Sequence, residues 1–365
     1  MSAQSPLHAV HLRLGAIVTD FAGWTMPLRY GSELAEHRAV REAAGLFDLS
    51  HMAEIEVLGS GAGAALDYAF VGQPSAIQVG RARYTMLCSS DGGVLDDLVV
   101  YRLQEQRFLV VANAGNASVV AAALRERAYG FAADVVDKSS AYALIAVQGP
   151  RASMIVASVA NVDVTALPYY SIARAQVGGD AVLLARTGYT GEDGFELYCA
   201  VAGAQRLWQT LTDAGSPHGL APAGLACRDT LRLEAGMPLY GNELHAGVTP
   251  FEAGLGRVVK FDKPDDFVGR HALAARRDEG PKRVLVGLSG TGRRSARHGY
   301  AVLSPDSAHV GDVTSGALSP TLTRPVAMAY VPTELSEPGT RLAVDISGHV
   351  EPVEVVLLPF YRRSA

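Results

Sequence analysis

The feature that most constrains this fold is a change of pattern near Gly280. Before it, helical and strand-like segments alternate, whereas beyond it short β-like runs are separated by Gly, Pro and Ser. That rhythm is typical of an all-β barrel or sandwich. The runs are 284–288, 300–303, 310–314, 328–331, 342–346 and 353–358. The sequence therefore predicts a multidomain α+β chain that ends in a separate, all-β C-terminal domain.

Chain length and net charge further restrict the kind of protein that this sequence can encode. The 365 residues suggest two or three domains, and a net charge of −5 lacks the basic field of a nucleic-acid binder. The longest strictly apolar run, 141–147, is far shorter than a membrane span, and the N-terminus lacks the pattern of a secretory signal. Cys88, Cys199 and Cys227 are odd in number and far apart. We therefore expect a cytoplasmic protein without disulfides or a zinc site.

Local patterns place the elements before Gly280. Ser32 is expected to cap a helix that stops at Gly45. Strand-like runs and a following helix then indicate a compact α+β unit at 52–139; they are 54–58, 84–88, 94–101, 108–112 and the helix 117–129. A buried strand at 141–148 follows, and later strands and helices are expected at 181–186, 195–200, 203–214, 223–235 and 268–277.

The candidate motifs for cofactor and metal binding each lack a residue that the chemistry requires. The run 59–64 (Gly-Ser-Gly-Ala-Gly-Ala) fits a loose dinucleotide pattern, but 78–83 carries no acid to hold a ribose. It is therefore interpreted as a strand-to-helix turn. His8 and His11 have helical spacing but no third ligand in view, which favours surface histidines. No Walker A loop or nucleophile elbow occurs.

Two neighbouring acids follow the Gly92-Gly93 turn inside an apolar strand. Since adjacent strand residues point to opposite faces, Asp96 shares a face with Leu98, and Asp97 shares the other with Tyr101. The two carboxyls are therefore not a proton-sharing pair, and at most one faces a given pocket. Such a carboxylate suits an acid, a base or an anchor for a cation. The alternative is that both residues finish a hairpin turn.

Two further segments carry polar groups suited to a ligand. The loop 187–196 has three glycines, an aromatic ring at Tyr189, and Glu196, which could accept two hydrogen bonds from an amidine-like edge. Arg228 and Arg232 lie one helical turn apart and could grip carboxylates. The alternatives are a hairpin turn with a solvated Glu and an exposed helix whose arginines pair with Asp229 and Glu234.

Taken in order, these segments resemble the T-protein of the glycine cleavage system, a tetrahydrofolate-dependent aminomethyltransferase family. The resemblance covers essentially the whole chain, and the ordered series is more specific than any single motif. The matching segments are Asp20-Phe-Ala-Gly-Trp-Thr-Met-Pro-Leu28, Leu46-Phe-Asp-Leu-Ser-His-Met52, Gly92-Gly-Val-Leu-Asp-Asp-Leu-Val-Val-Tyr101, Val147-Gln-Gly-Pro150, Thr187-Gly-Tyr-Thr-Gly-Glu192, Arg228-Asp-Thr-Leu-Arg-Leu-Glu-Ala-Gly236, Leu239-Tyr-Gly-Asn242, Thr314-Ser-Gly316 and Ser319-Pro320.

The resemblance implies three domains arranged as a cloverleaf around a central folate cavity. A folate-binding domain would span 1–51 and 140–275, an inserted α+β domain 52–139, and a jelly-roll-like β-barrel 276–365. It also implies the reaction. A lipoylated H-protein brings an aminomethyl group, the methylene carbon passes to tetrahydrofolate, and 5,10-methylenetetrahydrofolate, ammonia and dihydrolipoyl H-protein are released. No metal, NAD, flavin, nucleic acid or membrane is implied.

By position in the motifs, the resemblance implies that Asp96 is the catalytic aspartate and that Glu196 holds the pterin edge. The same matching gives Arg228 as a folate or substrate contact, and Tyr361 or Arg362 as a C-terminal residue that reaches the cavity. The residues expected to line the pocket are Met52, Tyr84, Asn113, Tyr189 and Tyr240.

Two alternative functions and the role of one basic stretch remain open at this point. A folate-dependent demethylase of the same superfamily would take a methyl or methylene group from a free small molecule. A folate-binding module would bind without catalysis, although the presence of both Asp96 and Glu196 argues against it. The basic stretch 270–297, which includes Arg276 and Arg277, could receive an acidic carrier protein or could be a solvated face between domains.

Overall fold

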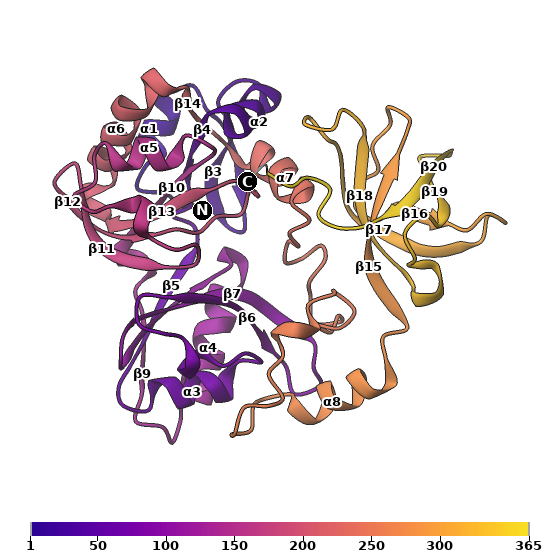
Figure 1. Cartoon of the computed structure of the whole chain (residues 1–365), viewed down its shortest axis with the longest axis horizontal. Coiled ribbons are helices and arrows are strands. Elements are labelled where there is room, and N and C mark those ends of the chain that lie inside the picture. The colour runs from indigo at the N-terminus through magenta and orange to yellow at the C-terminus, as the bar shows by residue number, and fades with distance from the viewer. Residues whose placement is uncertain (1, 364–365) are drawn as a thin grey trace.

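The computed structural model describes residues 2–363. Its first unit is built on a six-stranded sheet with the order β11-β12-β13-β10-β4-β14 (Figure 1). The strands are β4 (Ala44–Asp48), β10 (Tyr142–Gln148), β11 (Ile172–Val177), β12 (Asp180–Ala185), β13 (Gly194–Ala200) and β14 (Leu220–Pro222). The helices are α1 (His8–Arg13), α2 (Glu33–Glu42), α5 (Ala152–Ala157), α6 (Ala204–Gly215) and α7 (Leu225–Glu234).

The apolar run predicted as a buried strand is β10, at the centre of this sheet. Ile145 and Val147 pack with α5 and α6 on one face, while Leu144 and Ala146 pack with α2 and α7 on the other. Burial on both faces explains why the run is apolar rather than alternating. The second face also contacts Tyr101 of the next unit, so this cluster joins two sheets.

The helix expected after Ser32 is α2, and the Ser32 hydroxyl accepts a hydrogen bond from the Ala35 N–H at 3.4 Å. The expected stop at Gly45 is wrong, because the helix ends at Glu42 and Gly45 lies inside β4. A Cβ on Gly45 would lie 2.5 Å from the Val40 side chain. The glycine therefore permits close packing of β4 against the helix. Sequence patterns also missed a small N-terminal sheet of β1 (Ala3–Gln4), β2 (Ile17–Phe21) and β3 (Trp24–Arg29).

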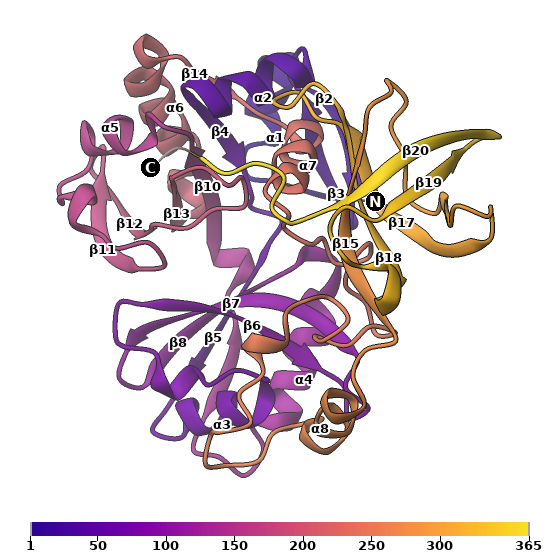
Figure 2. The same cartoon turned by 45° about the vertical axis from the view of Figure 1, so that its right-hand side comes forward.

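The second unit is a five-stranded antiparallel sheet with the order β6-β7-β8-β5-β9. Its elements are β5 (Ala53–Leu58), α3 (Ala62–Ala69), β6 (Ala82–Cys88), β7 (Val94–Gln104), β8 (Arg107–Ala112), α4 (Ala117–Arg127) and β9 (Asp134–Asp137). The glycine-rich run 59–64 is the turn between β5 and α3. Helices α3 and α4 cover one face of the sheet around Val57, Leu98 and Val100. The opposite face turns toward the first unit (Figure 2).

A long segment with little regular structure, residues 236–269 (the strap), leaves α7 and packs along the second unit before α8 (Arg270–Glu279). Leu244, Val248 and Phe267 of the strap share a core with Met86 and Val94. Short 3-10 turns complete the regular structure at Pro74–Ala76, Ala114–Asn116, Ser139–Ala141, Val164–Ala166, Val201–Gly203, Ser216–His218, Gly256–Val258 and Thr333–Leu335.

The β-rich C-terminal region forms a closed six-stranded barrel with the order β15-β18-β17-β16-β19-β20, which confirms the predicted all-β domain. Its strands are β15 (Arg283–Gly290), β16 (Ala301–Leu303), β17 (His309–Leu318), β18 (Pro325–Pro332), β19 (Arg341–Ile346) and β20 (His349–Val356). The chain after β20 returns to the first unit beside α7 (Figures 1 and 2). Within residues 2–363 no helix is long and apolar enough to cross a membrane.

Candidate active site

A cavity of about 510 Å³ lies where the two α+β units and the strap meet. That volume suits a drug-sized ligand. The second unit supplies Tyr84, Asp97 and Asn113 from β6, β7 and the segment before α4. The first unit supplies Glu196 from β13 and Arg228 from α7. No residue beyond Leu255 lines the cavity in the part of the chain that the structure describes.

The two acids of β7 point to opposite faces of the sheet. Asp96 shares the helix-covered face with Leu98 and Val100, and its side chain is fully buried. Asp97 shares the other face with Tyr101 and lines the cavity. The predicted division of the two carboxyls between faces is therefore observed. Asp96, which the family resemblance implied as catalytic, lies behind the cavity wall rather than in it.

Asn113 connects these two carboxyls. Its Nδ2 donates to Asp96 Oδ1 and to Asp97 Oδ1, both at 2.9 Å. Asn116 Nδ2 also donates to Asp96 Oδ1, at 2.6 Å, and the Tyr84 hydroxyl donates to Asp97 Oδ2 at 3.0 Å. An amide lies between the acids, and no direct hydrogen bond joins them among the described contacts. Both side chains are thus held in fixed orientations.

Burial sets the charge state of both acids, because desolvation disfavours the carboxylate. Burial raises the pKa of Asp96 to about 7, with the neighbouring Asp97 charge adding to the effect and the Asn116 hydrogen bond opposing it. Burial likewise raises the pKa of Asp97 to about 6, against the hydrogen bonds of Tyr84 and Asn113. Asp97 is therefore a cavity-facing carboxyl with a pKa of about 6, a value that suits an acid–base group near neutral pH.

Glu196 lies on the opposite wall, in β13. Its Oε2 accepts hydrogen bonds from the Thr187 hydroxyl at 2.5 Å and the Tyr101 hydroxyl at 3.3 Å. Its Oε1 has no hydrogen-bond partner among the described residues, while the side chain lines the cavity. Burial raises the pKa of Glu196, and the Thr187 hydrogen bond and the Arg228 charge oppose that rise. One fixed oxygen and one open oxygen suit a ligand with several N–H donors.

Arg228 projects from α7 into the same end of the cavity. Its guanidinium lies 4.6 Å from the centre of the Tyr189 ring, a cation–π contact. No hydrogen bond or ion pair holds it within residues 2–363, and burial lowers its pKa. A half-buried cation without a fixed partner is costly and is well placed to meet a polar or anionic ligand group.

The glycine-rich loop that carries Tyr189 is shaped by Gln148, the last residue of β10. Gln148 Nε2 donates to the Thr187 carbonyl at 3.0 Å, and its Oε1 accepts from the Thr190 hydroxyl at 3.0 Å. A Cβ on Gly188 would lie 2.0 Å from Gln148 Oε1. The sequence predicted glycines that let the backbone approach a ligand, whereas here Gly188 lets the backbone approach a buried side chain.

The cavity brings together most of the residues that the sequence singled out. Those that line it are Met52, Tyr84, Asn113, Tyr189, Glu196, Arg228 and Tyr240. Arg232 does not join Arg228: it is buried and pairs with Asp229 and Glu243, so neither the gripping pair nor the exposed helix is observed.

The C-terminal residues lie elsewhere. Tyr361 packs its ring 4.0 Å from the Arg41 guanidinium, and Arg362 is exposed. Neither lines the cavity.

Sequence reasoning missed several lining residues. Thr187 and Tyr101 fix Glu196, which a motif search for ionisable groups does not register. His51 also lines the cavity, and burial together with the Arg228 charge lowers its pKa to about 4, so it is neutral near pH 7. The sequence feature that could have identified His51 is its position next to Met52 in the segment 46–52. Within residues 2–363 no group of three or more His, Cys, Asp or Glu side chains is arranged to hold a metal ion.

Comparisons with known proteins agree with this architecture. A family profile described as the GCVT N-terminal domain matches residues 7–263, and the glycine cleavage T-protein C-terminal barrel domain matches residues 283–362. The aminomethyltransferase of Saccharopolyspora erythraea is 62% identical over 99% of both chains. That of Bacillus subtilis is 43% identical over 100% of both.

A solved structure gives the same result. The crystal structure of glycine cleavage system aminomethyltransferase T from Bartonella henselae superposes with a TM-score of 0.93 at 37% identity, covering 99% of this chain and 98% of that one. The two family profiles together span both α+β units and the barrel. The chain therefore belongs to the glycine cleavage T-protein family of aminomethyltransferases.

Proposed function

We propose that the central cavity binds tetrahydrofolate and that Asp97, rather than Asp96, is the carboxylate that acts on it. The observation that carries the proposal is the arrangement of the two walls. Glu196 and Arg228 offer an open carboxylate oxygen and an unpartnered guanidinium at one wall, and Asp97 is held by Tyr84 and Asn113 at the other.

Each wall suits a different part of the folate. A pterin presents ring N–H and amino donors along one edge, which the open Oε1 of Glu196 can accept, while Tyr189 and Tyr84 supply aromatic surface. With this edge anchored on Glu196, the amine nitrogens of the folate extend toward Asp97. Binding of this kind fixes orientation before reaction, which lowers the entropic part of the barrier.

Asp97 then has a defined task. The reaction moves a one-carbon unit from the lipoyl sulfur to a folate nitrogen with release of ammonia, and positive charge develops on the departing carbon. A preorganised carboxylate inside a largely apolar cavity stabilises that charge. Asp97 also hydrogen-bonds the attacking amine, and Tyr84 and Asn113 keep its oxygens aimed at the cavity. Asp96 orients Asn113 from behind.

We also propose that the aminomethyl group arrives on the lipoyl arm of an H-protein. The basic stretch 270–297 is one candidate contact surface. Several of its arginines already have acidic partners within the chain: Arg277 pairs with Asp278, Arg283 with Glu252 and Arg294 with Glu351. Those pairs favour a solvated face at these three positions.

A turnover assay with purified protein tests the function. Tetrahydrofolate is supplied with aminomethylated H-protein, and ammonia release is followed. We expect turnover that requires both substrates, and Glu196→Gln to weaken folate binding at least tenfold, because an amide replaces the acceptor of a charge-assisted hydrogen bond. Turnover with a small methylated amine instead of H-protein identifies a demethylase, and folate binding without turnover identifies a binding module. Either result would refute the proposal that the aminomethyl group arrives on an H-protein.

A further inference from the structure

One side chain in the wall of the central cavity, His51, lacks a hydrogen-bond partner. It follows β4, lines the cavity and has only 3% of its surface exposed. Its ring packs edge-on against Phe21, with 5.4 Å between the ring centres. Its Nδ1 is enclosed and has no partner within residues 2–363. Because a buried polar atom without a partner destabilises a protein, an imidazole in this position is best explained by a ligand.

The backbone around His51 is held by buried hydrogen bonds. The Ser50 N–H donates to Asp48 Oδ1 at 2.9 Å, and the Ser50 hydroxyl accepts from the Leu144 N–H at 3.1 Å. Asp48 is in turn held by His11 Nε2 at 2.8 Å. His11 is fully buried, so the expectation of a surface histidine is wrong at this position. The imidazole of His51 therefore stands at a fixed place in the wall and loses little freedom on binding a ligand.

The surroundings of His51 decide which hydrogen-bonding groups its ring offers. Burial and the Arg228 charge lower the pKa of His51 to about 4, so near pH 7 the ring is neutral and has one N–H donor and one acceptor. A buried N–H without an acceptor is rarer in proteins than a buried acceptor without a donor. The enclosed Nδ1 is therefore the acceptor, and Nε2 carries the proton as the nitrogen that a ligand in the cavity can reach.

His51 and Glu196 lie on the same wall of the cavity. Strands β4 and β13 both pair with β10, so one strand separates them and they are about 10 Å apart. Arg228 is near both side chains, because its charge shifts the pKa of each. The wall thus offers an acceptor at Glu196 and a donor at His51. A pterin has the complementary pattern, because its N–H and amino donors lie beside a carbonyl oxygen at ring position 4.

We propose that His51 determines which pteridine rings the central cavity accepts: its Nε2–H donates a hydrogen bond to the 4-oxo group of the folate and rejects rings with a 4-amino group. This inference rests on the proposed function. A 4-amino group would place its own N–H donors against Nε2–H, and two donors that face each other leave both without an acceptor. A site built around a hydrogen bond to one group rejects analogues that lack it more strongly than an apolar pocket does.

Calorimetric titration with tetrahydrofolate and with its 4-amino analogue tests the inference. The ratio of the two Kd values measures the discrimination in wild type, His51→Leu and His51→Gln. We expect His51→Leu to lower the ratio about tenfold, because it removes one neutral hydrogen bond. His51→Gln should keep most of the wild-type ratio, since an amide N–H can replace Nε2–H. Glu196 is present in all three proteins, so the change in the ratio reports on His51.

Urea unfolding of the same proteins without ligand separates this role from a structural one. His51→Leu should be at least as stable as wild type, because leucine replaces a buried polar atom that lacks a partner. The matched control is His349→Leu at an exposed position of β20 that does not line the cavity, and it should leave the Kd ratio unchanged.

An unchanged Kd ratio in His51→Leu, or an equal loss of the ratio in His51→Gln, would overturn the inference and leave the proposed function intact. If His51→Leu does not fold, the nitrogen-15 spectrum of the wild-type histidines decides, with the His51 signal identified by its loss in His51→Gln. Protonation at Nε2 supports the inference, and protonation at Nδ1 overturns it. Failure of wild type to bind tetrahydrofolate refutes the proposed function itself.

Discussion

At the scale of single residues, the neighbouring acids of β7 have different surroundings although they share one motif. The strand places Asp96 among the side chains under α4 and Asp97 at the cavity. Period-two alternation predicted that only one of them faces a pocket. It could not say which one, because that depends on which face α3 and α4 cover. The answer lies in tertiary packing and not in the local sequence.

Substituting each acid should separate the two roles. Asp97→Asn should lower kcat about 100-fold with little change in stability, because it removes a charge at the reacting atoms. Asp96→Asn should instead lower the free energy of unfolding by about 1–3 kcal/mol, because a new amide N–H would face the donors of Asn113 and Asn116. Steady-state kinetics and urea unfolding measure the two effects. The reverse pattern would return the catalytic role to Asp96.

The titration of Asp97 should appear in the pH profile. Its pKa is raised to about 6, so its carboxylate, the active form, is lost as pH falls through that value. We expect kcat/KM for folate to fall below pH 6, approaching tenfold per pH unit. The residual activity of Asp97→Asn should lack this acid limb. An unchanged limb in that variant would show that another group controls it.

The sequence was thus largely sufficient to predict which residues line the cavity. Glu196, Arg228, Tyr84 and Asn113 line one cavity as expected. The hydrogen bonds that fix these side chains were not predictable. Thr187 and Tyr101, for example, donate to Glu196 although Tyr101 lies far from it in the sequence. Tyr361 was placed by register from a short tail, and packing against Arg41 holds it outside the cavity.

At the scale of elements, local patterns predicted most helices and strands because propensity, caps and turns agree there. Gly45 is one exception, since it serves packing between α2 and β4 rather than a helix end. The strap also escaped prediction. Its apolar residues have no regular period, and they are ordered by a core shared with β6 and β7.

The loop from Thr187 to Glu192 offers a test of one such packing contact. Gly188→Ala should cost about 1–3 kcal/mol and weaken folate binding, because its Cβ would lie 2.0 Å from Gln148 Oε1 and displace Tyr189. In a Gln148→Ala background the same change should cost less than about 1 kcal/mol, since the obstruction is gone. Unfolding and folate titration of the four proteins measure the coupling. Strict additivity would contradict it.

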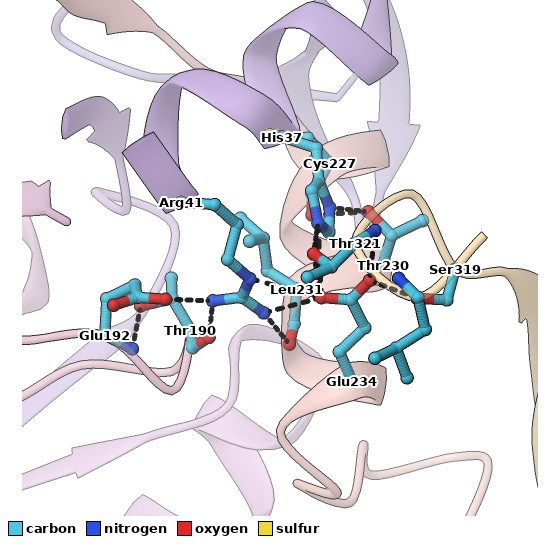
Figure 3. Close-up of polar contacts among 11 residues, drawn as sticks. His37, Arg41, Thr190, Glu192, Cys227, Thr230, Leu231, Glu234, Ser319 and Thr321 are labelled. Carbon is cyan, nitrogen blue, oxygen red and sulfur yellow. Dashed lines mark hydrogen bonds and ion pairs between the residues drawn. The ribbon is translucent and has the colours of Figure 1, made fainter. Parts of the chain in front are cut away.

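At the scale of the whole molecule, Glu234 at the end of α7 joins the first unit to the barrel (Figure 3). Its Oε2 accepts from Arg41 Nη2 at 2.9 Å and from the Thr321 hydroxyl at 2.8 Å. Its Oε1 accepts from the Ser319 hydroxyl at 2.5 Å. Arg41 also donates to Glu192 at 2.8 Å. The buried pair of Glu234 and Arg41 therefore connects α7, α2, the cavity loop and the barrel.

Removing the charge of Glu234 should weaken the attachment of the barrel to the first unit. Glu234→Gln should lower the free energy of unfolding by about 3 kcal/mol, because it leaves Arg41 and the barrel hydroxyls with a weaker partner inside the protein. Arg294→Gln breaks an exposed pair within the barrel and should cost less than about 1 kcal/mol. Urea unfolding compares the two variants. Detachment of the barrel should also make the transition of Glu234→Gln biphasic, because the domains no longer unfold together.

The difference in the free energy of unfolding between wild type and Glu234→Gln should depend on pH in a defined direction. Burial would raise the pKa of Glu234, but its contacts with His37, Ser319 and Arg41 outweigh that effect and lower the pKa to about 2. A carboxyl with a lowered pKa stabilises the fold above its unfolded value of about 4.5, and that stabilisation is lost as pH falls toward 2. The gap between wild type and Glu234→Gln should therefore be constant near neutral pH and close between about pH 4.5 and 2. A gap that stays constant down to pH 2 would mean that the carboxylate charge does not hold the barrel in place.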